Sequence, residues 1–197
     1  FKGHADYYEG DIETGEVLES WLNTGRHDVI AAHFSGPDKV GHKWGILSEE
    51  YEDKMKDIDQ QVDRLLGLVP SNWTVVVTAD HGMTPSGSHG SAEADTRNVL
   101  AVITGPDVAV GAPQKSSAQL DLAAMMLYDL GLAFPSQVNG RVPLEVFKAP
   151  PSEKAIVSQW NWEASLARHL HFHPGDKDKV VGHVLKDFSK EDRTWLE

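Results

Sequence analysis

Three runs of apolar residues along the chain have the length and composition of buried strands. They cover residues 29–34, 73–79 and 99–104, and a glycine follows each run within three residues. The second run is rich in β-branched residues, which favour strands. Such predominantly apolar runs, without regular alternation, are typical of strands covered on both faces in a parallel sheet.

Between and after these runs, apolar residues recur with helical spacing. Steps of three and four from Ser48 to Gly67 predict an amphipathic helix, with the serine as its N-terminal cap and the glycine at its end. Residues 119–130 predict a second helix, closed by Gly131, and residues 152–170 predict a last one. This order of elements predicts an α/β fold with a mostly parallel central sheet flanked by helices.

The length of 197 residues suits one globular domain. Linker-like composition occurs at residues 148–151 (Lys-Ala-Pro-Pro), so we expect residues 1–148 to belong to one domain and residues 149–197 to form a helical or irregular extension. The chain begins without Met and reaches its first strand-like run only after Asp28. We therefore expect it to be the downstream part of something longer.

Charge and composition narrow the classes of partner. Eighteen Lys and Arg residues against 30 Asp and Glu residues give a formal net charge of -12. This charge repels a nucleic-acid backbone, so we expect no nucleic-acid partner, and it favours a cationic partner or a divalent metal. The absence of cysteine excludes thiolate metal sites and cysteine nucleophiles, which leaves oxygen and imidazole as metal ligands. No apolar stretch approaches the roughly 20 residues that a membrane helix needs.

Aspartate and histidine follow the first two predicted strands. Asp38 and His42 lie four positions apart after the first strand, so a helical turn would place them on one face. Asp80 and His81 follow the second strand, and His89 comes a few residues later. Ligand sites in open α/β sheets collect beyond the carboxyl ends of the strands. A single Asp-x-x-x-His pair often occurs by chance without binding metal, but five Asp and His side chains in these positions together predict a site for divalent metal.

Other candidate residues have simpler structural explanations. Lys39 and Lys43 lie in the same loop as Asp38 and could meet a substrate phosphate, although lysines beside such a loop are as often plain surface. We interpret four further histidines and two tryptophans as core, solvated or packing residues: His33, His169, His171, His173, Trp160 and Trp162.

Two motifs resemble the alkaline phosphatase superfamily, and within it the type I phosphodiesterase and nucleotide pyrophosphatase branch. The sequence from His33 to Gly45 is similar to that branch's strand, Asp-x-x-x-His pair and trailing glycine. Asp80-His81-Gly82-Met83, followed by Gly87-Ser88-His89-Gly90, resembles its second signature. The helix with Asp59 and the segments 119–122 and 139–141 are similar to segments that follow in the same order. The closest resemblance is to the catalytic domains of glycosylphosphatidylinositol (GPI) ethanolamine phosphate transferases, over about residues 20–148.

The resemblance implies an alkaline-phosphatase-like fold, of which this chain is the C-terminal portion, and a site for two metal ions, usually zinc. By position, Asp38, His42 and His89 would hold one ion, and Asp80 and His81 would hold the other. Two cations about 4 Å apart can stabilise both the attacking and the leaving oxygen of an in-line displacement. The implied function is phosphodiester hydrolysis or phosphoryl transfer, most like phosphoethanolamine transfer to a glycan or lipid. Residues 1–148 would then be the downstream part of the metal-dependent catalytic domain.

The resemblance also requires an upstream Asp ligand and a Thr nucleophile. Residues before the first motif offer no suitable setting, because the candidates lie in polar, glycine-spaced sequence without a buried strand leading into them: Asp6, Asp11, Thr14 and Thr24. We therefore expect the nucleophile upstream of Phe1, in the missing half of the domain or on a second chain. The resemblance further favours an extracytosolic compartment such as the ER lumen or a periplasm.

Two alternatives stay open. The chain could be a catalytically silent relative, a binding or regulatory subunit whose metal only stabilises the fold. It could also be another enzyme of the superfamily, such as a nucleotide pyrophosphatase, a phosphomutase or a sulfatase-like protein. Met83 and the Gly-Ser-His-Gly sequence after it favour the phosphodiesterase branch.

Overall fold

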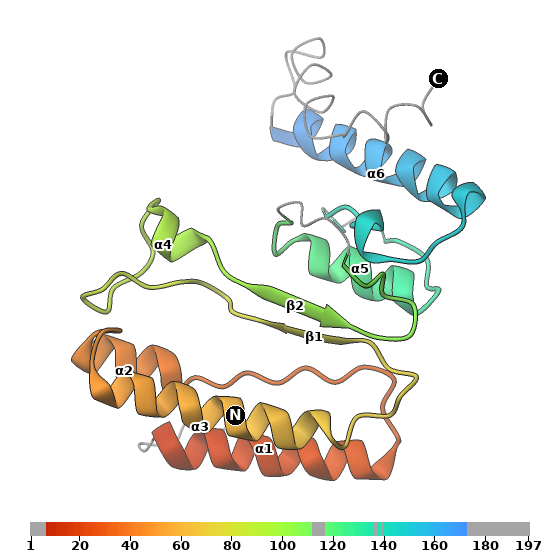
Figure 1. Cartoon of the computed structure of the whole chain (residues 1–197). Helices are drawn as coiled ribbons and strands as arrows, with labels where there is room; N and C mark the ends of the chain where they lie inside the picture. The colour runs from red at the N-terminus through yellow and green to blue at the C-terminus, as the bar shows by residue number, and fades with distance from the viewer. Residues whose placement is uncertain (1–6, 112–116, 136–137, 139, 173–197) are drawn as a thin grey trace. The chain divides into compact units, whose positions relative to one another are not determined.

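The chain divides into two units, Phe1–Val102 and Ile103–Glu197, in a computed structural model that describes residues 7–111, 117–135, 138 and 140–172. The first unit contains helices α1 to α4 and strand β1, and strand β2 begins at its end. The second unit contains helices α5 and α6 and the short 3-10 helix η1 (Figure 1). All five predicted metal ligands belong to the first unit.

Three packed helices form one layer of the first unit. Helices α1 (Tyr7–Thr24), α2 (Gly36–Trp44) and α3 (Glu49–Leu66) contact one another (Figure 1). The predicted cap of α3 is confirmed, because the Ser48 hydroxyl accepts a hydrogen bond of 3.2 Å from the backbone N–H of Tyr51. Three acidic residues in the first turn of α3 complement its dipole.

Helix α1 is an element that the sequence pattern did not predict. Gly10 and Gly15 lie inside it, and each glycine costs about 1 kcal/mol of helix propensity relative to alanine. Its contacts with α2 and α3 compensate for this weak local preference, since most helical stability in proteins comes from tertiary packing.

The sheet is smaller than the apolar runs predict. Strand β1 (Val75–Thr78) pairs with β2 (Ala101–Thr104), and the two run antiparallel (Figure 1). Residues 29–34 are extended but pair with no strand among the described residues, and Val29 is 45% exposed. A mostly parallel sheet is therefore not confirmed. An apolar run shows a tendency to be buried, but it does not specify the partner that would supply the hydrogen bonds.

The second unit is organised around a small apolar core. Helix α5 (Asp121–Asp129) is followed by Gly131 at φ +65°, as predicted for its end, and η1 (Leu144–Val146) contacts α6 (Pro151–Phe172). The Asn161 side chain bonds both the N–H and the carbonyl of Val142, at 2.7 and 2.9 Å. The apolar side chains buried around these contacts are Val108, Ala124, Met125, Val142, Leu144, Phe147 and Val157.

Some expectations fall outside this description. The boundary expected after residue 148 stays a prediction. The side chains of His169 and His171, and all of His173, lie outside the described residues.

None of the helices in the described part of the chain has both the length and the apolarity of a membrane span. Helix α4 (Ala94–Arg97) is a single turn in the loop between β1 and β2.

Candidate metal centre

Helix α2 presents the first pair of predicted ligands on one face. Its first turn begins with Gly36-Pro37, where a proline costs no hydrogen bond. Asp38 lies in the first turn and His42 in the last, and Asp38 Oδ1 lies 3.3 Å from His42 Nε2. The sequence spacing therefore correctly placed these two side chains together.

A tight loop after β1 brings the third predicted ligand to the same place. The backbone N–H of Ser88 donates to the Thr84 hydroxyl at 3.1 Å, and the N–H of Thr84 donates to the Ser88 carbonyl at 2.8 Å. Gly87 has φ +80°, and a Cβ there would overlap the backbone carbonyl of Gly41 in α2. Only glycine therefore allows this loop to approach α2 closely enough to place His89 beside it.

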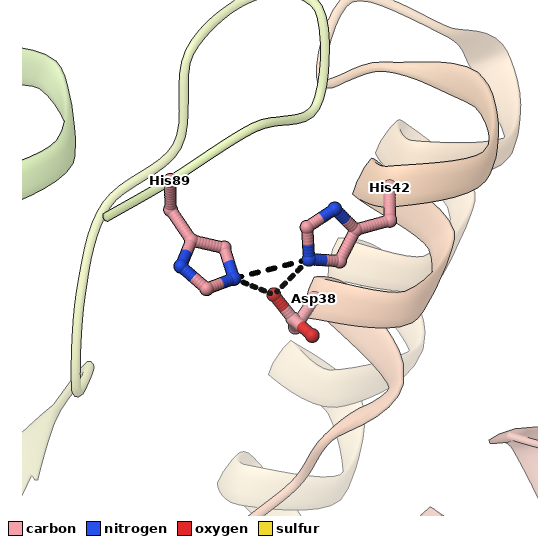
Figure 2. Close-up of side chains that lie close together, drawn as sticks. All are labelled: Asp38, His42 and His89. Atoms are coloured by element: carbon pink, nitrogen blue, oxygen red, sulfur yellow. Dashed lines mark hydrogen bonds and ion pairs between the residues drawn. The ribbon is translucent and has the colours of Figure 1, made fainter. Parts of the chain in front are cut away.

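The three side chains converge on one carboxylate oxygen. One ligand atom from each of Asp38, His42 and His89 lies within 4.8 Å of the other two (Figure 2). Asp38 Oδ1 is 3.4 Å from His89 Nε2, and the two histidine Nε2 atoms are 3.0 Å apart. Among the described residues, the buried Asp38 Oδ1 atom has no hydrogen-bond partner, although these two imidazole nitrogens lie within 3.4 Å of it. A carboxylate oxygen and two imidazole nitrogens this close together suit a zinc ion with an open coordination position.

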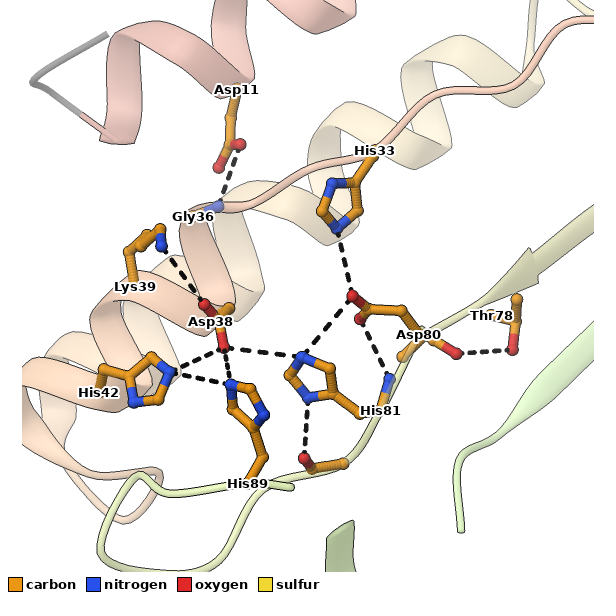
Figure 3. A network of polar contacts seen from close by, with 12 residues as sticks. Asp11, His33, Gly36, Asp38, Lys39, His42, Thr78, Asp80, His81 and His89 are labelled. Atoms are coloured by element: carbon orange, nitrogen blue, oxygen red, sulfur yellow. Dashed lines mark hydrogen bonds and ion pairs between the residues drawn. The ribbon is translucent and has the colours of Figure 1, made fainter. Parts of the chain in front are cut away.

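The second pair of predicted ligands lies next to this cluster. His81 Nε2 is 3.6 Å from Asp80 Oδ2 and 3.9 Å from Asp38 Oδ1 (Figure 3). The His81 Nδ1 atom lies 3.0 Å from the Gly82 carbonyl. A proton on Nδ1 would be donated to that carbonyl and leave Nε2 free to bind metal. The His81 and His89 rings stack at 3.8 Å, so all five predicted side chains gather in one region.

The pKa of Tyr51, in α3, is affected by burial and by the negative charge of the neighbouring cluster. Burial, followed by the nearby negative charge of Asp38, raises the pKa of the Tyr51 hydroxyl above its ordinary value. This side chain therefore stays protonated at neutral pH and adds no charge to the region.

Comparison with known protein families identifies the family of this chain. A family model described as type I phosphodiesterase / nucleotide pyrophosphatase matches residues 3–125, more than half of the chain. The chain belongs to this family. The membership confirms the resemblance seen in the two motifs, and it assigns the chain to a family of enzymes with an α/β fold.

Curated relatives of this phosphodiesterase family support the same assignment. GPI ethanolamine phosphate transferase 1 of Emericella nidulans is 32% identical over 71% of this chain, and that of Aspergillus fumigatus is 31% identical over 80%. The catalytic subunit of human GPI ethanolamine phosphate transferase 3 is 32% identical over 67% of the chain. The alignments cover 18%, 20% and 12% of these relatives, so the chain spans a fifth of their length or less. No solved structure matches the chain.

His33 is a residue of the site that the sequence interpretation missed. The expectation that it lies in the core is wrong, because its side chain is 62% exposed and its Nε2 atom lies 3.7 Å from Asp80 Oδ2 (Figure 3). Residues 29–34 lack a strand partner among the described residues, so the extended backbone does not bury this side chain. Its position in the motif, five residues before Asp38, was the one available signal.

The two lysines of α2 near Asp38 differ in their contacts. Lys39 Nζ lies 3.8 Å from Asp38 Oδ2, and the side chain is about half exposed. Lys43 Nζ lies 3.8 Å from the centre of the Trp44 ring. A substrate-binding role for Lys39 stays a prediction, and Lys43 is engaged with its neighbour.

Three of the candidates that precede the first motif, Asp11, Thr14 and Thr24, have partners within this phosphodiesterase-family chain. The Thr14 and Thr24 hydroxyls donate to the carbonyls of Gly10 and Trp21 within α1, at 2.9 and 2.8 Å. Asp11 pairs with Lys54. Asp6 lies outside the described residues.

Proposed function

We propose that this chain carries most of a two-metal phosphoryl-transfer site, with zinc as the metal. Asp38, His42 and His89 would hold one ion, and Asp80 and His81 would hold part of the other. The observation that carries the proposal is the buried Asp38 Oδ1 atom, which has three imidazole Nε2 atoms at 3.3 to 3.9 Å and, in the part of the chain that the structure describes, no hydrogen-bond partner.

The residues of the chain would position the reacting groups and hold charge. Bound zinc would supply Lewis-acid stabilisation of the phosphoryl oxygens. The Gly82 carbonyl would orient the His81 ring through its Nδ1 atom. Lys39, exposed beside Asp38, would contact the negatively charged oxygens of the substrate phosphate. The protonated Tyr51 would add no negative charge that opposes the approach of such a substrate.

The family and its relatives support a proposed substrate class. We propose a phosphoester substrate, with transfer of phosphoethanolamine to a glycan or lipid acceptor as the reaction most like that in the relatives' names. We also propose a location outside the cytosol, such as the ER lumen, which the family resemblance favours. Hydrolysis of nucleotide pyrophosphates, which the family description also includes, is the competing outcome of a substrate comparison.

The nucleophile and a further ligand would come from an upstream half of the domain. The short coverage of the relatives supports this part of the proposal, as do the apolar residues that the first unit leaves exposed. Val29, Val77 and Leu100 are 45%, 40% and 70% exposed. We propose that upstream strands cover them, and that residues 29–34 then join a mostly parallel sheet.

Reconstitution tests the proposal. The 197-residue chain would be expressed with the upstream half of its own protein, and turnover of bis-p-nitrophenyl phosphate would be measured with and without zinc. We expect zinc-dependent turnover that falls at least about 1000-fold in Asp80→Ala and His89→Ala, because each removes a metal ligand. Circular dichroism should show that both variants keep their helices.

His27→Ala is the matched control, because it removes an exposed histidine whose ring contacts Trp21 and not the cluster. Its turnover should equal that of the wild type. Unchanged turnover in His89→Ala would contradict the metal assignment. Robust turnover by the 197 residues alone would contradict the upstream nucleophile, and bound zinc without turnover in the reconstituted protein would indicate a silent relative.

A further inference from the structure

A buried ion pair lies beneath the start of the helix that carries Asp38. Asp11 of α1 and Lys54 of α3 are each 1% exposed, and Lys54 Nζ lies 2.7 Å from Asp11 Oδ2. The other carboxylate oxygen, Asp11 Oδ1, accepts a hydrogen bond of 3.1 Å from the backbone N–H of Gly36 (Figure 3). Gly36 is the first residue of α2, so one carboxylate links all three helices.

The residue at this junction has no room for a side chain. A Cβ on Gly36 would overlap Asp11 Oδ2 and the Cε atom of Lys54. The glycine therefore lets the backbone of α2 approach the ion pair directly. The contact fixes where α2 begins, and Asp38 follows only two residues later, in the first turn.

The ion pair is a poor way to gain stability alone. Burying two charges is costly, and apolar residues of similar volume often replace such a pair with no loss of stability. The Asp11 carboxylate supplies something that an apolar side chain cannot, namely a fixed acceptor for the first N–H of α2. The N–H groups at a helix start have no partner within the helix, so an acceptor there sets the position of the first turn.

We propose that Asp11 and Lys54 are positioning residues for the metal centre. They would hold the start of α2 so that Asp38 and His42 face His89, which comes from a different element, the loop after β1. This inference rests on the proposed metal function. Asp11 was excluded above as a metal ligand by its sequence setting, and its burial against Lys54 gives it this indirect role.

Two double variants isolate the hydrogen bond to Gly36 from the charge of the pair. Asp11→Asn with Lys54→Met removes both charges but keeps a side-chain oxygen as acceptor, whereas Asp11→Leu with Lys54→Met removes the acceptor too. Zinc affinity of the 197-residue chain would be measured by competition with a chelator, after circular dichroism has confirmed folding. We expect the first variant to bind within about threefold of the wild type and the second to bind about tenfold or more weakly.

Lys56→Met is the matched control, because Lys56 lies on the same helix but pairs with Glu52 and Asp53 at the surface. It should leave zinc affinity unchanged. A folded Asp11→Leu/Lys54→Met chain with wild-type affinity would overturn the positioning role and leave the metal proposal standing. A wild-type chain that binds no zinc would instead overturn the metal proposal, and this inference with it.

A measurement on the wild-type chain covers the case in which the leucine variant does not fold. Coupling between two sites is reciprocal, so zinc binding at Asp38 should strengthen the hydrogen bond at Gly36. Saturating zinc should therefore slow hydrogen exchange of the Gly36 amide by about tenfold or more. Zinc binding that leaves this exchange rate unchanged would overturn the inference.

Discussion

The two units differ in what they bury. Among the described residues, the second unit buries seven apolar side chains around Met125 and Phe147, whereas the first unit buries Val40 and Leu65. The first unit instead buries the Asp11–Lys54 ion pair, with each side chain 1% exposed. The unit with the candidate metal centre therefore buries few apolar side chains beside a charged pair, whereas the other combines a larger apolar core with the buried hydrogen bonds of Asn161. We expect the first to depend on single polar residues, on metal and on further protein, and the second to stand more independently.

The largest loss of stability is expected from Lys54→Met. Removing the lysine ammonium group leaves the Asp11 carboxylate buried without its charge partner, which lowers the free energy of unfolding by about 3–5 kcal/mol. Peptide-resolved hydrogen exchange should show loss of protection in α1, α2 and α3 and unchanged protection in α5. Loss of protection spread equally over both units would break the distinction between them. Lys56→Met, which removes only the surface ion pairs with Glu52 and Asp53, should change neither unit.

Met125→Ala should destabilise the second unit and leave the first unit unchanged. This side chain is 3% exposed in the core of the second unit, and its truncation costs about 2–5 kcal/mol through lost burial and a cavity. Protection of α5 should fall while zinc affinity of the first unit stays at the wild-type value. An accompanying loss of zinc affinity would show that the two units are coupled.

Tyr128→Phe should give the smallest loss of stability of these variants. The Tyr128 hydroxyl donates a hydrogen bond of 2.6 Å to Glu153 Oε1, which joins α5 to α6, and its loss costs about 0.5–1 kcal/mol at a partly exposed position. Burial, and then the bond to Glu153, raise the pKa of this hydroxyl. The stabilisation is therefore fully present below the ordinary tyrosine pKa of about 10 and is lost as pH rises through the higher folded-state pKa.

Denaturant unfolding of the second unit at several pH values checks this sign. The wild-type free energy of unfolding should decline above pH of about 10, and the phenylalanine variant should lack that part of the decline. An identical pH dependence in the two proteins would show that the Tyr128–Glu153 bond contributes nothing to stability.

Local patterns in the sequence predicted local features well. The cap at Ser48, the glycine after α5 and the shared face of Asp38 and His42 depend on residues within one or two helical turns of each other. These features are encoded by short-range spacing and backbone preference, so no knowledge of the rest of the fold was needed.

Features that depend on distant residues could not be predicted in this way. Helix α1 contains unfavourable glycines and forms because of contacts with α2 and α3. The bond from Gly36 to Asp11 joins residues 25 positions apart, and no periodicity marks it. The exposure of His33 depends on which strand, if any, lies beside residues 29–34. The apolar character of a run does not determine which strand pairs with it.

The gathering of five metal-ligand candidates came from motif resemblance together with the α/β pattern. Spacing alone linked Asp38 to His42, whereas the link to His89, which lies 47 residues beyond His42, came from the order of the predicted strands and from the family motif. The glycines of that motif have a structural explanation, because Gly87 permits the loop to contact the backbone of Gly41.

Zinc content of the purified chain is the decisive measurement for the metal centre. After equilibrium dialysis against zinc, elemental analysis would compare the wild type with His89→Ala and with the control His27→Ala. We expect at least one tightly bound zinc ion per chain in the wild type and the control, and its loss in His89→Ala. Equal zinc content in all three proteins, or none in the wild type, would contradict the assignment of Asp38, His42 and His89 as a metal centre.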